Sequence, residues 1–302
     1  MAPGAPRDPR DNRRGIAFMV ISLASFVVND ALIKELGSEL PLWQTIFIRG
    51  VFASLWVGGA LWVSSVRLGT FSGSKVPVLI RGLLDCLATF CYIGSLLHLP
   101  LGNAVSINMA SPLMVTALAV VVLKEHVDRL RWLAIIVGFG GVVLLVQPSA
   151  DGFNGWALLC LFATLVHSVR DLVTRWISAQ VPSLIVTLVT ALTITAVSGV
   201  ACLVLPWHSV SWRALGVLAA AALFLSLGYF FVIRSTRTGD LSVVAPFRYS
   251  GLPIALVIGW VVWGELPDPA GWVGIILLIG AGLYLLRRER STRAVRASAD
   301  PI

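Results

Sequence analysis

Two stretches of the sequence, KEHVDRLRWLAIIVGFG at residues 124–140 and GELPDPAGWVGIILLIG at residues 264–280, carry one pattern 140 residues apart. In each, a glutamate is followed after six residues by a tryptophan, and after seven more by a glycine. Offsets of 140 or 141 residues align further pairs, namely Gly15/Gly155, Asp30/Asp171, Lys34/Arg175, Pro41/Pro182 and Leu101/Leu241. The sequence therefore predicts two related halves.

The composition places both halves in a membrane. Of the 302 residues, 57% are hydrophobic and 13% are charged, and the mean hydropathy is +0.88. Soluble domains carry about 25% charged residues, so this chain has too few to cover a surface in water. The net charge of +8 does not indicate a nucleic-acid partner, because the basic residues gather in the termini and in short loops between apolar runs. We predict an all-α integral membrane protein surrounded by the lipid bilayer.

Ten segments approach the length of roughly 20 apolar residues that a bilayer core about 30 Å thick requires. They are Gly15–Glu35, Leu42–Ser65, Val76–Leu97, Leu101–Leu123, Leu130–Val146, Trp156–Ile177, Ser183–Leu205, Ala214–Ile233, Leu241–Trp263 and Trp272–Leu286. Pro112, Pro246 and Pro253 interrupt the fourth and ninth segments, and the backbone groups freed there are suited to forming a site.

The basic residues are divided unequally between the two sides of these helices. With the N-terminus inside, seventeen lysines and arginines lie on the inner side and two lie on the outer side, which predicts that both termini are cytoplasmic. Each half has five helices, an odd number, so the second half enters the membrane upside down, as in many secondary transporters. The predicted organisation is an N-terminal tail at 1–14, repeats at 15–147 and 155–287, and a C-terminal tail at 288–302.

Several motifs resemble the EamA repeats of the drug/metabolite transporter superfamily. They are SPL at 111–113, LKE at 123–125, GFGG at 138–141, APFRY at 245–249 and GE at 264–265. Within the superfamily, the chain most resembles the importers of S-adenosylmethionine and riboflavin. The motifs that carry this resemblance are RG at 81–82, HLPL at 98–101, RDL at 170–172 and PFRY at 246–249. The resemblance implies a ten-helix metabolite carrier of the bacterial inner (plasma) membrane.

Four arginines fall inside the predicted helices: Arg49, Arg81, Arg170 and Arg248. A charge at the bilayer centre costs at least ~2.5–3.5 kcal/mol, so each arginine should face protein or water. Arg248 lies roughly 10–12 Å into the ninth helix, and its guanidinium fork suits a carboxylate or phosphate. We predict that Arg248 binds an acidic substrate group, helped by Arg170 or Arg81. The alternative is that these arginines pair internally with Asp85 or Asp171.

Other polar residues of the predicted helices are further candidates for substrate contact. Arg81 and Asp85 lie one turn apart, with Tyr92 two turns further on the same face. Alternatively, Arg81 reaches the cytoplasmic interface and Asp85 only neutralises it. Tyr92 and Tyr249 are expected to supply apolar or stacking contact. Asn108 either lines the cavity or forms an interhelical hydrogen bond.

Two acid–base pairs with i,i+4 spacing occupy matching places in the halves. They are Asp30 with Lys34 and Asp171 with Arg175, and both pairs are consistent with ion pairs at helix ends. Asp171 is also a candidate to orient an arginine or to bind a substrate amine. Asp30 and Arg49 are candidates for coupling or gating. Alternatively, Arg49 has a structural role and bonds to a carbonyl or to Asp30.

Together these features predict a secondary-active transporter of a small anionic or zwitterionic metabolite that works by alternating access, with a proton or another ion as a candidate coupling partner. The sequence lacks the Walker A, HExxH and GxSxG motifs, and its four cysteines lack the spacing of metal ligands, so we expect neither an enzyme nor a metal or cofactor. An exporter of amino acids or drugs, and a membrane pore or sensor without transport, remain the alternatives.

Overall fold

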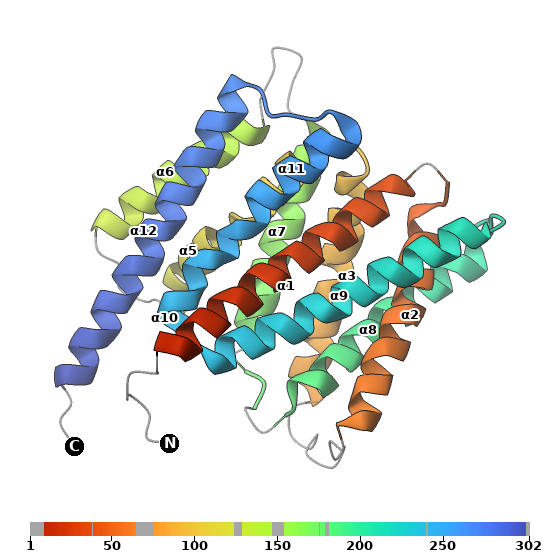
Figure 1. The fold of residues 1–302 in the computed structure, drawn as a ribbon, viewed down its shortest axis with the longest axis horizontal. Coiled ribbons are helices and arrows are strands. Elements are labelled where there is room, and N and C mark those ends of the chain that lie inside the picture. Colours follow the sequence, from red (N-terminus) through yellow and green to blue (C-terminus); the bar gives the residue numbers. More distant parts are fainter. Residues whose placement is uncertain are drawn as a thin grey trace.

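The computed structural model describes residues 9–37, 39–64, 75–123, 129–146, 154–174, 176–178, 181–239 and 241–299. Its elements, drawn in Figure 1, are α1 (Pro9–Glu35), α2 (Leu42–Val63), α3 (Lys75–Leu96), α4 (Leu101–Asn108), α5 (Ser111–Leu123), α6 (Arg129–Val146), α7 (Gly155–Thr174), α8 (Ser183–Val204), α9 (Trp212–Thr238), α10 (Leu241–Val244), the 3₁₀ helix η2 (Ala245–Ser250), α11 (Gly251–Trp263) and α12 (Pro269–Ala299). Every regular element in these ranges is helical.

The ten-helix prediction is confirmed. Among the described residues, nine helices are long and apolar enough to cross a bilayer, and the shorter apolar helix Trp132–Val146 makes the tenth. The main difference concerns the two expected tails, because α1 already begins at Pro9 and α12 continues to Ala299. The 31 residues of α12 span roughly 46 Å at 1.5 Å per residue, which exceeds the bilayer core.

The fourth and ninth predicted spans are each interrupted, as their prolines predicted. In the first half, α4 ends at Asn108 and α5 begins at Ser111. Pro112 has no N–H, so the carbonyl of Asn108 cannot accept the usual helical bond from four residues ahead. In the second half, Pro253 stands in the same relation to Tyr249 of η2. The two prolines are 141 residues apart, so the interruptions occupy equivalent positions.

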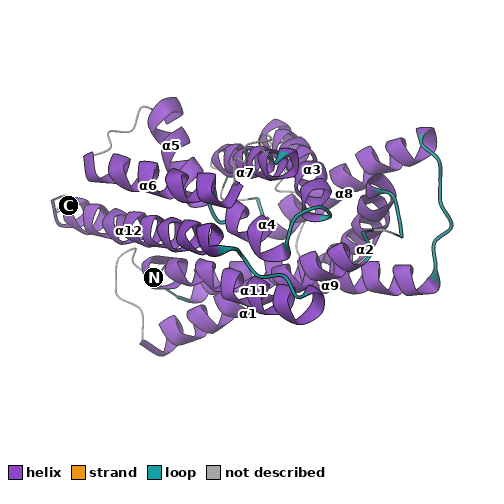
Figure 2. Cartoon of the chain, turned by 90° about the horizontal axis from the view of Figure 1, so that it is seen from above, coloured by secondary structure: helices purple, strands orange, loops and turns teal. Residues whose placement is uncertain are grey.

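The helices of one half pack mainly against helices of the other half. The packing of α1 on α9 is matched by that of its counterpart α7 on α3, and the packing of α2 on α9 is matched by that of α8 on α3. The remaining large contacts join α2 to α8 and α6 to α12, which are each other's counterparts. These two pairs lie at opposite edges of the bundle (Figures 1 and 2). Exchanging the two halves therefore leaves the packing pattern unchanged.

Counterpart helices run in opposite directions. On α2 and α8, Gly50 faces Thr195, whereas the earlier residue Phe47 faces the later residue Gly199. The same antiparallel order holds for α6 and α12, where Gly141 meets Gly274 and the earlier Gly138 meets the later Ala281. The odd helix count of each half predicted this inversion. The start of α1 and the end of α12 accordingly lie at the same end of the bundle (Figure 1), here called the terminal end; the other is called the distal end.

Candidate functional site

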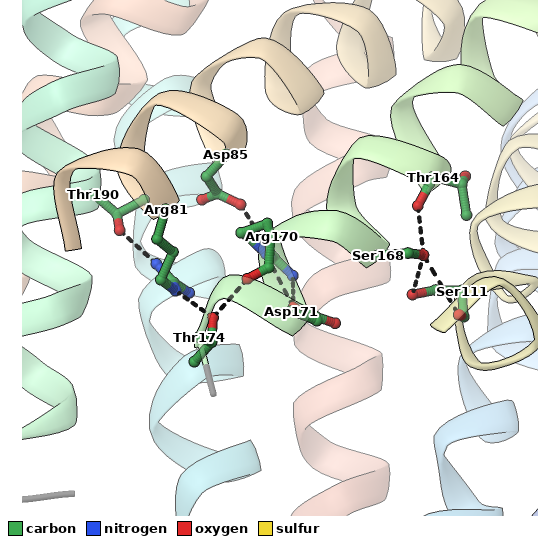
Figure 3. Close-up of polar contacts among 9 residues, drawn as sticks. All are labelled: Arg81, Asp85, Ser111, Thr164, Ser168, Arg170, Asp171, Thr174 and Thr190. Atoms are coloured by element: carbon green, nitrogen blue, oxygen red, sulfur yellow. Dashed lines mark hydrogen bonds and ion pairs between the residues drawn. The ribbon is translucent and has the colours of Figure 1, made fainter. Parts of the chain in front are cut away.

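Arg170 of α7 forms the centre of the most highly charged contact between the halves. Its guanidinium donates to Asp85 of α3 and, through Nε and Nη2, to Asp171 Oδ1 at 3.0 and 2.7 Å. The side chains of Arg170 and Asp85 are 15% and 6% exposed, whereas Asp171 is 38% exposed. Figure 3 shows Arg170 between its two acids. The structure therefore confirms the internal pairing that was the alternative for this arginine, and it makes Arg170 the least available of the four to bind an anion.

Arg81 of α3 has only neutral partners. Its Nε donates to Thr174 Oγ1 at 3.1 Å and its Nη1 donates to Thr190 Oγ1 at 2.5 Å (Figure 3). Asp85, one turn away, forms its ion pair with Arg170, and it acts on Arg81 only through space. The reason is that α7 packs on α3 and brings a second arginine to Asp85. Arg81 is thus anchored by hydroxyl groups and forms no ion pair with any described residue.

Asp30 of α1 is held by neutral groups as well. Tyr92 donates its hydroxyl to Asp30 Oδ2 at 2.8 Å, and the Asn29 amide donates to Oδ1 at 2.9 Å. The expected pair with Lys34 does not form, because Lys34 turns to a partner in the second half. Tyr92 is 7% exposed, and its hydroxyl links two helices of the first half.

Arg49 of α2 is 7% exposed, yet within the described residues it forms neither a hydrogen bond nor an ion pair. The acids close enough to interact with it electrostatically are Asp30 and Asp85. The expected bond from Arg49 to a carbonyl or to Asp30 is absent from the described part of the chain. We call Arg49 and the residues around Arg170 and Asp30 the polar cluster, consisting of Asp30, Arg49, Arg81, Asp85, Tyr92, Arg170 and Asp171.

Three other predicted site residues lie outside this cluster. Arg248 is exposed on η2 and has no hydrogen-bond or ion-pair partner among the described residues. Gly251, which follows η2, lies against Leu23 of α1 and Met109 at the α4–α5 break, so this part of the second half borders the interrupted first-half span.

Tyr249 and Asn108 mark the two helix interruptions. Tyr249 is 5% exposed and packs against Gly282 of α12, a helix that contributes nothing to the polar cluster. The structure does not bring Tyr249 to the cluster. Asn108 is half-buried and forms no side-chain hydrogen bond with any described residue. Close to this break, Ser111 pairs with Ser168 of α7 at 3.2 Å (Figure 3).

The distal end is crossed by bonds that sequence spacing did not reveal. Lys34 Nζ contacts both carboxylate oxygens of Glu265 at 2.6 and 2.8 Å, and it also donates to the carbonyl of Leu99 at 2.7 Å. The backbone N–H of Leu101 donates to the same carboxylate at 3.0 Å. We call these contacts the distal lock. Glu265 belongs to the repeated sequence pattern, but its partner Lys34 lies 231 residues away in the chain.

Two further contacts join the halves near the distal lock. Arg213, at the start of α9, forms ion pairs with Glu35 and Glu39, all three of them partly exposed. Gln44 exchanges two hydrogen bonds with the backbone of His208, at 2.7 and 3.1 Å. Side chains of both halves are therefore joined at the distal end.

The polar cluster combines equal numbers of opposite charges, with three arginines and three aspartates. Arg170 pairs with two of the acids, whereas Arg49 and Arg81 have no acidic partner at ion-pair distance among the described residues. Asp171 Oδ2 likewise accepts no hydrogen bond from the described chain. The arrangement can thus offer cationic and acidic groups to one polar molecule. No group of three or more His, Cys, Asp or Glu side chains suited to a metal occurs in the described ranges.

Known transporters are similar to this chain along most of its length. The S-adenosylmethionine uptake transporter of Rickettsia bellii is 27% identical over 277 residues, covering 91% of this chain and 94% of the relative. The pseudopaline exporter CntI of Pseudomonas aeruginosa is 25% identical over 284 residues, with 92% and 98% covered. The riboflavin transporter of Rhizobium johnstonii is 26% identical over 211 residues, with 70% of each chain covered.

A solved crystal structure supports the fold. It aligns with a TM-score of 0.63 at 17% identity and covers 90% of this chain and 98% of its own. The EamA-like transporter family matches residues 13–147 and 154–288, one match in each half. The chain therefore belongs to the EamA-like transporter family, and it is a multi-pass membrane transporter rather than an enzyme.

Proposed function

We propose that this protein is a secondary-active transporter that carries a small anionic or zwitterionic metabolite by alternating access between its inverted repeats. The observation that carries the proposal is the position of the polar cluster at the boundary between the halves. Arg170 and the hydroxyls of Thr174 and Thr190 come from the second half, and they bond to Asp85 and Arg81 of the first. Binding at such a boundary couples the substrate to the relative motion of the repeats.

The charges of the cluster favour a zwitterion as the substrate. S-adenosylmethionine, named in the R. bellii relative, carries a carboxylate, an ammonium and a sulfonium group. Arg81 and Arg49 are suited to its carboxylate, and Asp171 is suited to its cationic groups. It is therefore the first substrate to test, with riboflavin as the second because of the R. johnstonii relative. Export is the alternative direction, favoured by the similarity to the P. aeruginosa exporter.

We further propose an inner-membrane location with both termini cytoplasmic. Described basic residues at the terminal end support this orientation, among them Arg13, Arg14, Arg234 and Arg237, because cytoplasmic ends of membrane helices are enriched in such residues. Asp30 is our candidate for carrying a coupling proton, since its described hydrogen-bond partners are neutral. Substrate binding is assigned to the cluster, with Asn108, Arg248 and Tyr249 contributing from the interrupted spans.

Transport and binding can be tested on the purified chain. Melting temperatures are measured with S-adenosylmethionine, riboflavin and a set of free amino acids, and a ligand at 100 times its Kd should stabilise the protein by about 2.7 kcal/mol. The stabilising compound should then show saturable uptake and counterflow in proteoliposomes. Linear, unsaturable flux would indicate a pore instead, and binding without flux would indicate a sensor.

Arg248→Ala is the variant for this assay. Because Arg248 is exposed and unpaired in the described structure, its removal should change the free energy of unfolding by no more than about 0.5 kcal/mol. Saturable transport should nevertheless be lost, and Arg248→Lys should restore it only in part, because lysine lacks the planar fork. Normal transport by the alanine variant would remove Arg248 from the site.

The distal lock gives a prediction about alternating access. Lys34 and Glu265 are only 10% and 26% exposed on their side chains, so removing one charge strands the other. We expect Glu265→Gln to favour the state open at the distal end by about 2 kcal/mol, or roughly 30-fold in population. The measurement is labelling of an Asn29→Cys reporter, in a chain without other cysteines, by an impermeant thiol reagent added to either face.

Arg213→Gln is the matched control for this experiment, because it breaks ion pairs at the same end whose members are 32–56% exposed. Exposed pairs contribute about 0–1 kcal/mol, so labelling should change little. Equal acceleration by the two variants, or none by Glu265→Gln, would contradict the role of the lock.

A further inference from the structure

Arg49 is the most deeply buried arginine of the polar cluster, and the two acids that act on its charge, Asp30 and Asp85, do so without direct contact. Only 7% of Arg49 is exposed, and within the described chain its guanidinium forms neither a hydrogen bond nor an ion pair. Burying a cation without a partner is costly, and natural proteins retain such a group where water or a ligand completes its contacts. The guanidinium of Arg49 is therefore free to take a direct partner that the described chain does not supply.

The neighbouring acids do not need Arg49. Asp30 already accepts hydrogen bonds from Tyr92 and Asn29, and Asp85 is already paired with Arg170. Removing the Arg49 charge would thus leave both acids with their hydrogen-bond partners, although Asp30 would lose a nearby cation. A residue retained for folding would be expected to satisfy one of these groups, whereas Arg49 stands near both and bonds to neither.

The position of Arg49 also suits an incoming molecule. It lies seven residues after the start of α2, or roughly 10 Å below the distal end. The distal lock and the Gln44–His208 contact close this end. Once they open, Arg49 is an unpaired cation within reach of that face. Arg248, which among the four arginines of the predicted helices also lacks a described hydrogen-bond or ion-pair partner, lies on η2 of the second half.

We infer that Arg49 binds the carboxylate of the transported molecule. The inference rests on the proposed transport function and adds to it a specific residue and contact: a charge-assisted, two-pronged bond between the guanidinium and the carboxylate. Asp30 and Asp85 flank this contact and disfavour ligands that carry additional negative charge. The site therefore selects a monocarboxylate with a nearby cationic group over a dicarboxylate.

The test compares Arg49→Met with Arg234→Met, the same substitution at an exposed arginine whose guanidinium lies over Phe230. Without ligand, Arg49→Met should melt about 2–4 °C higher than the wild type, since methionine fills the space without a buried charge. Arg234→Met should melt within about 1 °C of the wild type. A lower melting temperature for Arg49→Met would show a structural residue and overturn the inference.

Binding is then measured by calorimetry with S-adenosylmethionine and with its decarboxylated form. The wild type should prefer the carboxylate about 10- to 100-fold, and Arg49→Met should bind both forms equally weakly. Arg49→Lys should retain part of the preference. If Arg49→Met keeps the wild-type preference, the inference fails while the transport proposal stands. If the wild type binds neither compound, S-adenosylmethionine fails as substrate, and the unliganded melting temperature alone decides the role of Arg49.

Discussion

Replacing Arg170 with methionine is expected to cost about 3–5 kcal/mol of folding free energy and to abolish saturable transport. Arg170 is the shared partner of Asp85 and Asp171, and two of these three side chains are almost fully buried. Without the guanidinium, the buried carboxylate of Asp85 loses its ion-pair partner. The melting temperature should fall by roughly 10 °C, which can be followed by thermal unfolding in detergent.

A second substitution separates the structural part of this effect from the functional part. Asp85→Asn in the Arg170→Met background removes the stranded charge, so it should recover most of the lost stability. Transport should remain absent, because the link between the halves and the charge pattern of the cluster are both changed. A double variant as unstable as Arg170→Met alone would contradict the ion-pair account, and a double variant that transports would remove Arg170 and Asp85 from the mechanism.

The second large effect is expected at the crossing of α6 and α12. A Cβ atom at Gly141 would lie 2.6 Å from the carbonyl oxygen of Gly274 and 3.0 Å from the backbone nitrogen of Leu278. Both obstacles are backbone atoms, which cannot move aside unless the helices separate. Gly141→Leu should therefore destabilise the protein by about 3 kcal/mol, by the same route as overpacking of a core.

Gly140→Leu is the matched control, one residue away on the same helix. A Cβ atom there meets nothing within 4 Å, and the position is exposed, so a leucine can point into lipid. Its melting temperature should be unchanged. Similar losses from the two substitutions, measured by thermal unfolding and by the yield of monodisperse protein, would show that helix propensity rather than close contact is responsible.

The α6–α12 crossing and the contacts around Arg170 are expected to behave differently during transport. Gly141 and Gly274 bring α6 and α12 into backbone contact, whereas the cluster around Arg170 joins the halves through side chains that can exchange partners. In alternating access, we expect the first contact to persist and the second to rearrange when substrate binds. The proposed roles of Arg49 and of the distal lock both depend on such a rearrangement.

The sequence was enough to predict which residues belong to the candidate site. It was not enough to predict which of these residues bond to one another. Unusual charges within apolar helices drew attention to Arg81, Asp85, Arg170 and Asp171, and the structure brings all four together. The same reasoning gave no signal for Thr174 and Thr190, because hydroxyl side chains are common in membrane helices. Depth along a helix can be counted for Arg248 and Arg49, but the direction of their side chains cannot, so their contacts needed the structure.

The sequence by itself determined the membrane class, the ten spans and the inverted relation of the two halves. Hydropathy and helix length can be read from each segment alone, and the odd number of helices in each half can be counted. Prolines likewise determined where two spans are interrupted, through the missing N–H. Only the tertiary structure decided which charges meet. Lys34 bonds to Glu265 and not to Asp30 four residues away, and Asp85 bonds to Arg170 and not to Arg81. Those choices follow from the rotation and depth at which helices of opposite halves pack, and spacing along one helix does not contain that information.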